Sequence, residues 1–441
     1  MFFFVLTQTF SNVQRLAQAF IDLYSAGNML FRSWLAHVHC SPKSELCVLI
    51  DFTLRLIPEL EGQGELADVL PRLCKTMESF LESWQSFMSK KRFQHFYLNF
   101  YTAEQLVYLC TELGQGQPSQ KALMMLSFLK SNCTAEDVLR ASEGHEPPSS
   151  TKAVSDLLAL LDEERDLTTC LEYIWECYMS NMGAFLPNCL DVDTLGAWLK
   201  SLAGGERECV TRGFPQDLLH VGQPNLITCP RSEVLTSALA VYMNSPNQPL
   251  PTFDEVLLCT PQTTAEQVGL FLRRCLIPGS EGEKIYTMLF ADELSYDVSC
   301  RAEELFQHLQ GYNSTYRLII LCNCEREHCY IPSVFSQYKV HMIPQRPLTE
   351  IQQYLQHHYR VAQPSNSAAG VFKGSTCVGI VSSKRAGVGK RLRAKRALLS
   401  IENQGGVHFA CFSVLSIWLG RMIQTSGSRE VMGISRGGFS R

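Results

Sequence analysis

Two carboxylates that follow an apolar run are the residues of this sequence best suited to chemistry. The run covers residues 284–290, and Asp292 and Glu293 come almost directly after it. An aspartate in this position can hold Mg²⁺ through water, and the glutamate beside it can orient an attacking water, as in a Walker B motif. Asn323 follows the next apolar run and could sense the same ligand. Acidic residues also commonly cap a helix after a strand, so the pair alone is a weak signal.

The loop that would bind phosphate is missing from this part of the chain. Such a site needs a glycine-rich loop after the first strand, whose backbone N–H groups and lysine contact the phosphates. Residues 229–233 read CPRSE, without glycine or lysine, and Pro230 removes one N–H donor. We therefore predict no catalytic residue here and interpret Asp292 and Glu293 as a degenerate Walker B motif in a scaffold.

A second loop, at the end of residues 377–390, comes closer to a phosphate-binding pattern. The predicted nucleotide contacts are Gly387, Val388, Gly389 and Lys390. Lys384 stands where the first glycine of G-x-x-x-x-G-K-[ST] belongs, and Arg391 replaces the hydroxyl residue that ligates Mg²⁺. Two interpretations stay open, a loop that binds phosphate loosely and a basic surface loop.

A short cluster of cysteine and histidine invites a zinc interpretation, because thiolate and imidazole are preferred ligands of zinc. Its members are Cys322, Cys324, His328 and Cys329. The C-x-C-x3-H-C spacing is not a usual zinc pattern, and free cysteines are commonly core residues. We predict no metal site in this chain.

The composition favours a cytoplasmic protein with no transmembrane segment and no nucleic-acid partner. Charged residues make up 19% of the chain, the net charge is -4, and the 18 cysteines are dispersed singly. The apolar run 407–419 is shorter than a membrane span, and the start of the chain lacks the pattern of a signal peptide. The basic run 384–396 could be a nucleic-acid or nuclear-localisation patch, but it lacks aromatic residues that would stack on bases.

Four regions position these motifs. We predict a helical region at 10–205, a degenerate α/β module at 206–365, the start of a second module at 366–400, and a non-native or disordered tail at 401–441. The second module stops after its first strand and loop, so we expect a truncated product. The breaks near 144–150 and 203–206 are rich in Gly, Pro or Ser.

Helical spacing dominates the first region. One apolar face, predicted to be a core seam, comprises Val13, Leu16, Phe20, Ile21 and Tyr24. Two helix starts have capping-box spacing, Thr102 with Gln105 and Thr134 with Asp137.

After residue 220 short β-rich runs alternate with helices, which is typical of parallel βαβ units. The predicted strands are 225–229, 255–260, 284–290, 317–322, 338–343 and 375–382. The fold class is therefore α+β and multi-domain, an all-α region followed by an α/β module.

Four strings within this sequence resemble one family. They are QPLPTFDEVLLCTP at 248–261, LFADELSY at 289–296, EHCYIP at 327–332 and RAGVGK at 385–390. The chain resembles the mysterin family, giant AAA+ RING-type E3 ubiquitin ligases of vertebrates, over about residues 12–390. The resemblance implies a P-loop NTPase-like, dynein-like chain of AAA+ units, of which this segment holds the degenerate first unit and the start of the second.

The resemblance also implies cofactors and partners. It assigns ATP binding to residues 387–390, with Mg²⁺ in doubt because Arg391 stands where the family has serine. The implied partners are the rest of the AAA+ motor and, through regions that this sequence does not contain, E2 and ubiquitin. Zinc is implied only for those other regions. The parent family is enzymatic, and we expect this chain alone to be inactive.

Two other interpretations compete with a motor scaffold. One is a helical adaptor without nucleotide chemistry, whose working surface is the region 11–205. The other is an independent P-loop enzyme, which the lack of a strand-helix series after Lys390 disfavours.

Overall fold

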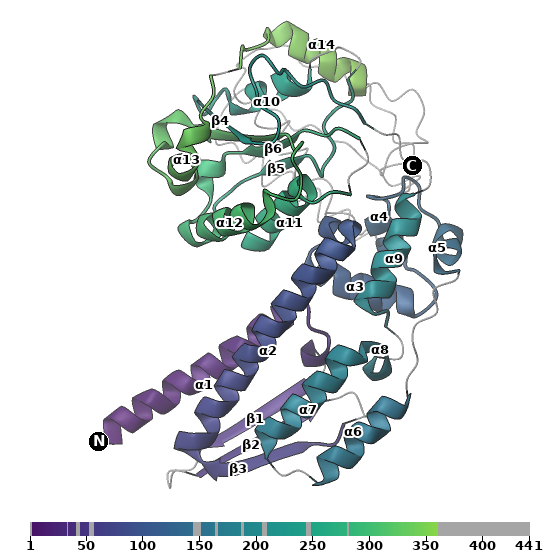
Figure 1. Ribbon diagram of the computed structural model, residues 1–441, viewed down its shortest axis with the longest axis vertical. Helices are drawn as coiled ribbons and strands as arrows, with labels where there is room; N and C mark the ends of the chain where they lie inside the picture. The colour runs from purple at the N-terminus through teal and green to yellow at the C-terminus, as the bar shows by residue number, and fades with distance from the viewer. Residues whose placement is uncertain are drawn as a thin grey trace, which may run out of the picture. The chain divides into compact units, whose positions relative to one another are not determined.

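The chain forms two compact units, each with its own hydrophobic core (Figure 1). The computed structural model describes residues 2–32, 34–40, 45–52, 57–143, 151–163, 166–186, 189–204, 210–243, 248–279, 282–341 and 343–359. Of the described residues, unit 1 comprises those within 2–204 and 269–279, and unit 2 comprises those within 210–268 and 282–359. The predicted second module at 366–400, the tail at 401–441 and the linker at 144–150 lie outside the described residues.

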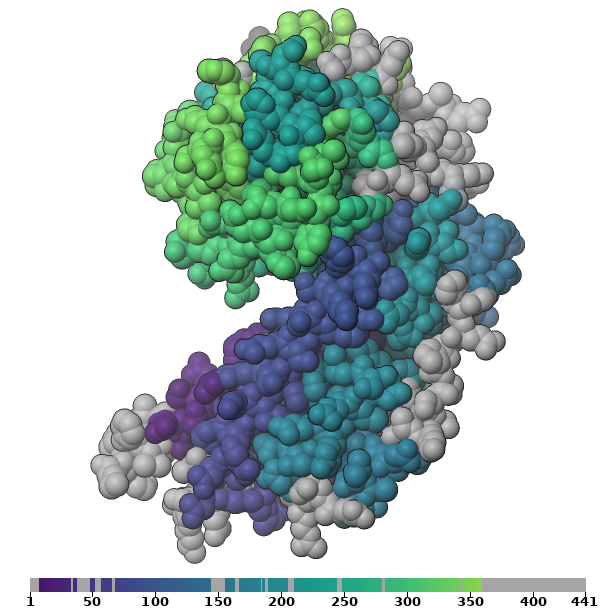
Figure 2. Space-filling model, viewed as in Figure 1, coloured from purple at the N-terminus to yellow at the C-terminus, as the bar shows by residue number. Residues whose placement is uncertain are grey.

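Unit 1 is built mainly from helices. The two longest, α1 (Phe2–Ser25) and α2 (Leu66–Gln94), lie side by side (Figure 2). The others are α3 (Ala103–Gly114), α4 (Gln120–Leu126), α5 (Ala135–Ser142), α6 (Thr151–Glu163), α7 (Leu167–Ser180), α8 (Met182–Phe185) and α9 (Val192–Ala203), with 3-10 turns η1 (Leu30–Arg32) and η2 (Phe96–Phe100).

Helix α1 buries a narrower face than the sequence predicts. Among residues 8–25, where the side chains are described, the buried ones are Leu16, Ala19, Phe20 and Leu23, which follow helical spacing. Ile21 and Tyr24, predicted to lie in the core seam, are 55% and 47% exposed. The guanidinium of Arg32 lies 4.3 Å from the centre of the Tyr24 ring, so this aromatic residue makes a cation–π contact at the surface.

The prediction that residues 10–205 are all-α is wrong, because unit 1 also contains an antiparallel sheet. Its strands β1 (Trp34–Cys40), β2 (Glu45–Phe52) and β3 (Leu60–Glu65) pair in chain order. The last strand reads LEGQGE, and its two glycines suggest a turn rather than a strand. A Cβ on Gly62 would stand 2.6 Å from Cδ2 of Leu167, so α7 packs against this strand only because the residue is glycine.

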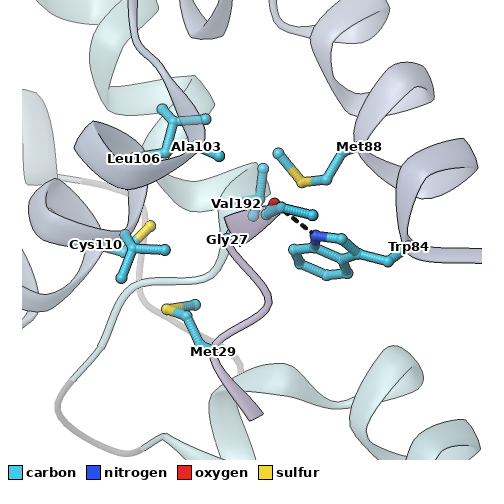
Figure 3. Close-up of a pocket in the computed structure, with 10 residues that line it drawn as sticks. Gly27, Met29, Trp84, Met88, Ala103, Leu106, Cys110 and Val192 are labelled. Atoms are coloured by element: carbon cyan, nitrogen blue, oxygen red, sulfur yellow. Dashed lines mark hydrogen bonds between the residues drawn. The ribbon is translucent and has the colours of Figure 1, made fainter. Parts of the chain in front are cut away.

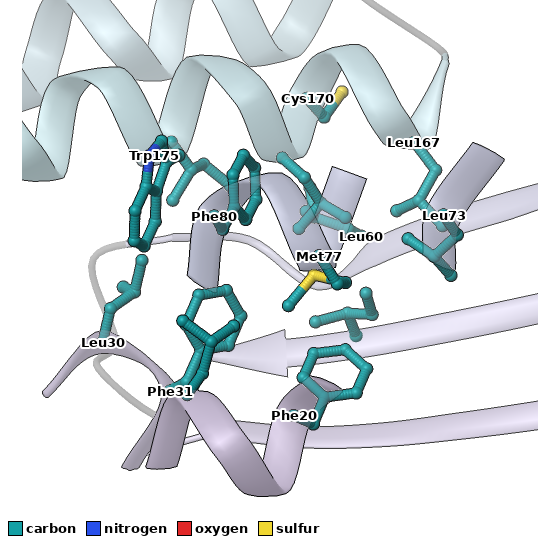
Figure 4. Packing of buried hydrophobic residues seen from close by; sticks show 14 of the residues in the cluster. Phe20, Leu30, Phe31, Leu60, Leu73, Met77, Phe80, Leu167, Cys170 and Trp175 are labelled. Carbon is teal, nitrogen blue, oxygen red and sulfur yellow. The ribbon is translucent and has the colours of Figure 1, made fainter. Parts of the chain in front are cut away.

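The core of unit 1 joins α1, the sheet, α2 and α7 (Figure 4). Phe80 of α2 and Trp175 of α7 stack with ring centres 4.5 Å apart and an interplanar angle of 9°. Phe31 lies against both rings, at 6.4 Å and 6.2 Å. Aromatic pairs of this kind contribute about 0.5–1.5 kcal/mol each beyond the area they bury. Elements far apart in the sequence are thereby held in one core.

Both predicted capping boxes of unit 1 are confirmed. The hydroxyl of Thr102 accepts from the backbone N–H of Gln105, and the side chain of Gln105 accepts in return. Thr134 and Asp137 are paired in the same way at the start of α5. Lys130 donates to Oδ1 of Asp137 at 2.7 Å. Burial opposes ionisation of this carboxyl, but the hydrogen bonds from Lys130 and Thr134 outweigh it and lower the pKa of Asp137 to about 2.

Unit 2 contains a parallel sheet with helices on both faces. Its strands are β4 (Pro224–Cys229), β5 (Val256–Leu258), β6 (Tyr286–Leu289) and β7 (Leu318–Asn323), in the order β4-β7-β6-β5. The parallel α/β prediction is thus confirmed for these four strands. The fifth predicted strand, 338–343, is wrong: Lys339 forms a single parallel bridge to Leu226, and the described residues around it form no strand.

The helices of this region are α10 (Val234–Tyr242), α11 (Ala265–Leu276), α12 (Tyr296–Leu309), α13 (Tyr330–Val334) and α14 (Leu348–Tyr359), with 3-10 turns η3 (Ala291–Glu293), η4 (Cys324–Arg326) and η5 (Ser336–Tyr338). Residues of α11 from Gly269 onward group with unit 1. Helices α10 and α14 pack on one face of the sheet, where Ile227, Ile319 and Leu321 form the core, and α12 lies on the other side (Figure 1). Alternate strand residues face α10 and α14, as the pleat requires.

A buried ion pair ties the chain before β4 to the start of β5. Arg212 donates from Nε to Oε1 of Glu255 at 2.7 Å and from Nη2 to Oε2 at 2.6 Å. The two side chains are 1% and 0% exposed. Arg212 also donates to the carbonyl oxygens of Pro249 and Leu250, and Thr252 donates its N–H and hydroxyl to Glu255. Every charge in this network therefore has several partners, which burial demands.

Gly27 lies beside a small apolar cavity of about 10 Å³ in unit 1 (Figure 3). Trp84 borders the same cavity and donates its indole N–H to the carbonyl oxygen of Ala26 at 2.9 Å. Gly27 has a φ of 80°, and a Cβ on it would stand 3.0 Å from Cβ of Ala103. Both the backbone conformation and the packing therefore require glycine at this position.

Gly27→Ala should destabilise unit 1 more than Gly116→Ala, its matched control. Gly116 has a φ of 81°, and no atom lies within 4 Å of the place that a Cβ would take, so alanine there meets only the left-handed backbone penalty, about 1–2 kcal/mol. At Gly27 crowding adds about 1–3 kcal/mol. Denaturant unfolding followed by tryptophan fluorescence measures both, because Trp84 and Trp175 are buried in this unit. Equal losses would contradict the packing at Gly27.

The carboxylate of Asp137 should contribute to stability only above acidic pH. Its pKa is lowered in the folded state, so the contribution is present above the unfolded pKa of about 4 and is lost as the pH falls toward about 2. We expect the stability difference between wild type and Asp137→Asn to shrink across that window. Glu136→Gln, which removes an exposed carboxylate from the same turn, is the control. A difference that stays constant from pH 5 to pH 2 would contradict the assignment.

Candidate functional site

The carboxyl ends of the parallel strands in unit 2 meet at one edge of the sheet, and the predicted site residues lie there. β6 ends at Leu289 and is followed by η3, which contains Asp292 and Glu293. Phe290 lies between the end of β6 and the start of η3. It adopts a φ of 53°, which is rare for a bulky residue and costs about 1–3 kcal/mol. This turn brings the acidic pair beneath the end of β7, where Asn323 is the last residue.

Asp292 and Asn323 are brought into direct contact. Oδ1 of Asp292 accepts from the backbone N–H of Asn323 at 2.9 Å, and the two residues are 1% and 3% exposed. The side-chain oxygen of Asn323 accepts from the N–H of Glu325 at 3.2 Å and so caps η4. The predicted sensor side chain therefore has a structural partner within its own loop.

The second oxygen of Asp292 accepts no hydrogen bond from the part of the chain that the structure describes. Nη1 of Arg326, in η4, lies 3.6 Å from it and forms an ion pair. Nothing in the sequence marks this arginine, because an Arg in a short polar loop carries no signal of its own.

Glu293 is held by Arg231, which belongs to the loop between β4 and α10. Nη1 of Arg231 forms an ion pair with Oε1 of Glu293, whose side chain is 8% exposed. The same guanidinium lies 5.1 Å from the centre of the Phe290 ring. The glutamate that would orient water in a hydrolase is thus neutralised by a residue of this chain.

The β4–α10 loop forms a tight turn without a phosphate cradle. The N–H of Glu233 donates to the carbonyl oxygen of Pro230 at 2.8 Å, which turns one of the few available donors inward. Glu233 occupies the N-cap of α10 without a side-chain cap hydrogen bond, so this helix start carries an acidic residue and no glycine or lysine. The residues present do not fit a nucleotide triphosphate at this edge.

Buried thiols surround the same edge. Burial raises the pKa of Cys229 to about 11, although a hydrogen bond from Ser237 acts in the opposite direction. Burial likewise raises the pKa of Cys322 well above its usual range. Both groups are neutral thiols at physiological pH, and neutral thiols are poor nucleophiles and metal ligands.

The cluster considered for zinc is dispersed between strand and surface. Cys322 is buried within β7, whereas Cys324 is exposed and Cys329 is half-buried. Within the described ranges no group of three His, Cys, Asp or Glu side chains is arranged to hold a metal ion. The predicted nucleotide contacts, Gly387, Val388, Gly389 and Lys390, lie outside those ranges.

A parallel α/β sheet with an acidic pair and an asparagine at its carboxyl edge defines an AAA-like module. In agreement, residues 224–340 match the family model described as the RNF213 AAA domain. The chain is 54% identical over 396 residues to the E3 ubiquitin-protein ligase RNF213 of Homo sapiens and 51% identical over 392 residues to that of Mus musculus. It is 34% identical over 411 residues to E3 ubiquitin-protein ligase rnf213-beta of Danio rerio.

The chain therefore belongs to the RNF213 family, the mysterin family that it resembles in sequence. Each of the three matches covers 88% of this chain and 8% of the relative, so the chain spans about a twelfth of the length of these relatives. None of the helices that the structure describes combines the length and apolarity needed to cross a bilayer.

Proposed function

We propose that this chain is a structural segment of an AAA+ E3 ubiquitin-protein ligase, and that unit 2 is a degenerate AAA+ module which does not hydrolyse ATP. The observation that carries this proposal is the glycine-free β4–α10 loop. Pro230 has no N–H, Glu233 turns its own N–H onto Pro230, and no lysine is present to contact phosphate.

We propose that nucleotide is contacted by the second loop of this segment, which comprises Gly387, Val388, Gly389 and Lys390. The support is the Gly-Lys pair in the sequence and the resemblance to the family. Arg391 offers a positive charge to phosphate but no oxygen ligand to Mg²⁺, so we expect ATP binding to depend weakly on the metal. The first module then serves as a rigid neighbour of a nucleotide-binding module in a dynein-like series.

Ubiquitin transfer, E2 binding and zinc binding are not assigned to residues of this chain. The names of the relatives support a place in the ubiquitin pathway for the protein to which this segment corresponds. We further propose a cytoplasmic location, with the rest of an AAA+ motor as the partner and without nucleic acid. A helical adaptor without nucleotide chemistry is not favoured, because the family match falls on the α/β unit.

Isothermal titration calorimetry of the full chain with ATP, with and without Mg²⁺, tests this division of roles. We expect saturable binding in wild type and in Glu293→Gln, and its loss in Lys390→Ala, because only the second loop offers phosphate a lysine. Binding that survives Lys390→Ala and disappears in Glu293→Gln would contradict the proposal. No binding to any variant would remove the second loop from it and leave a scaffold alone.

A further inference from the structure

Four charged side chains from three loops meet at the carboxyl edge of the sheet in unit 2. Asp292 and Glu293 follow β6, Arg231 follows β4, and Arg326 follows β7. The ion pairs are Arg231 with Glu293 and Arg326 with Asp292, the latter at 3.6 Å. The two positive and two negative charges balance each other without any bound ion.

The carboxylates are buried, whereas the arginines reach them from the surface. The side chains of Asp292 and Glu293 are 0% and 8% exposed, and those of Arg326 and Arg231 are 41% and 47% exposed. A buried carboxylate is costly unless a cation or several donors accompany it. In nucleotide hydrolases, a Walker B carboxylate is accompanied by Mg²⁺. Here a guanidinium lies in that role for each carboxylate.

Arg231 is positioned by more than its charge. Its guanidinium lies over the ring of Phe290, which is itself held in the left-handed conformation that turns the chain toward Asp292. The β4–α10 loop and the β6–η3 turn are therefore joined at two points, a ring face and a carboxylate. Arg326 joins the third loop to the same turn.

We propose that Arg231 and Arg326 are built-in counter-ions, which take the place of a metal ion at the Walker B carboxylates and keep the carboxyl edge of the sheet closed without a ligand. This inference rests on the proposed function, since it explains how a module without a phosphate loop keeps its acidic pair. The arginines neutralise the pair permanently, so the loops around it do not respond to nucleotide.

Thermal unfolding of the full chain, with and without Mn²⁺ as the probe cation, tests the proposal. Arg231→Gln and the double variant Arg231→Gln/Arg326→Gln should each lower the midpoint of the unit 2 transition by several degrees. Mn²⁺ should raise the midpoint of the double variant, because this variant has two carboxylates without counter-ions. Mn²⁺ should leave the midpoint of wild type unchanged. Lys339→Gln is the matched control, since it removes a cation from the exposed pair with Glu327 in the same unit.

A second set of variants separates charge from packing. Arg231→Lys keeps the charge and should recover most of the midpoint lost in Arg231→Gln. In a Glu293→Gln background, Arg231→Gln should cost much less than it does in wild type, because no buried carboxylate is left unaccompanied. This comparison keeps Arg326 in place and stays informative if the double arginine variant does not fold.

Three results would overturn the counter-ion role. They are a shift in Arg231→Gln no larger than in Lys339→Gln, the same shift with Glu293 or Gln at position 293, and stabilisation of wild type by Mn²⁺. If any of these three results is obtained while ATP binding does not depend on Glu293, the proposed function stands and only the counter-ion role is refuted. ATP binding that depends on Glu293 would refute the proposed function itself.

Discussion

The buried pair of Arg212 and Glu255 is the constraint on which the geometry of unit 2 depends. Both side chains lie fully inside the unit, where an unpaired charge would cost about 3–5 kcal/mol. The guanidinium fork satisfies both carboxylate oxygens and the carbonyl oxygens of Pro249 and Leu250. Such a network is satisfied in one arrangement only, so it fixes where the chain enters β4 and where β5 begins. A short strand of three residues, β5, needs that support.

The parallel sheet determines which residues meet at its carboxyl edge. The parallel strands deliver Asp292 and Asn323 to one place, and the loops after β4 and β7 deliver two arginines to the same carboxylates. Both carboxylates of this edge are thus paired with arginines of the same chain.

Much of unit 2 could be predicted because its signals are local. A buried parallel strand of unit 2 reads as a continuous apolar run. In unit 1 the capping box of Thr134 with Asp137 was equally local, because four residues define it. The sheet of unit 1 was not predicted, because β3 carries two glycines whose purpose is to admit α7 and α2. The prediction that Ile21 and Tyr24 are buried was wrong, because helical spacing identifies the apolar face of a helix but not how much of that face its neighbours cover.

The charge pairs of the site could not be predicted, because they join residues that are distant in the sequence. In the sequence Arg231 is only one residue of a loop that lacks glycine. No neighbouring residue indicates that it pairs with Glu293. The sequence predicts that the first module does not hydrolyse ATP, and the structure adds the ion pairs that Asp292 and Glu293 form with arginines.

Steady-state phosphate release from ATP by the full chain, compared with Glu293→Gln, tests the central claim most directly. We expect no release above background from either protein, because the β4–α10 loop contains neither glycine nor lysine and Glu293 is paired with Arg231. Release by wild type that disappears in Glu293→Gln would contradict it, since the acidic pair would then be a working hydrolytic site.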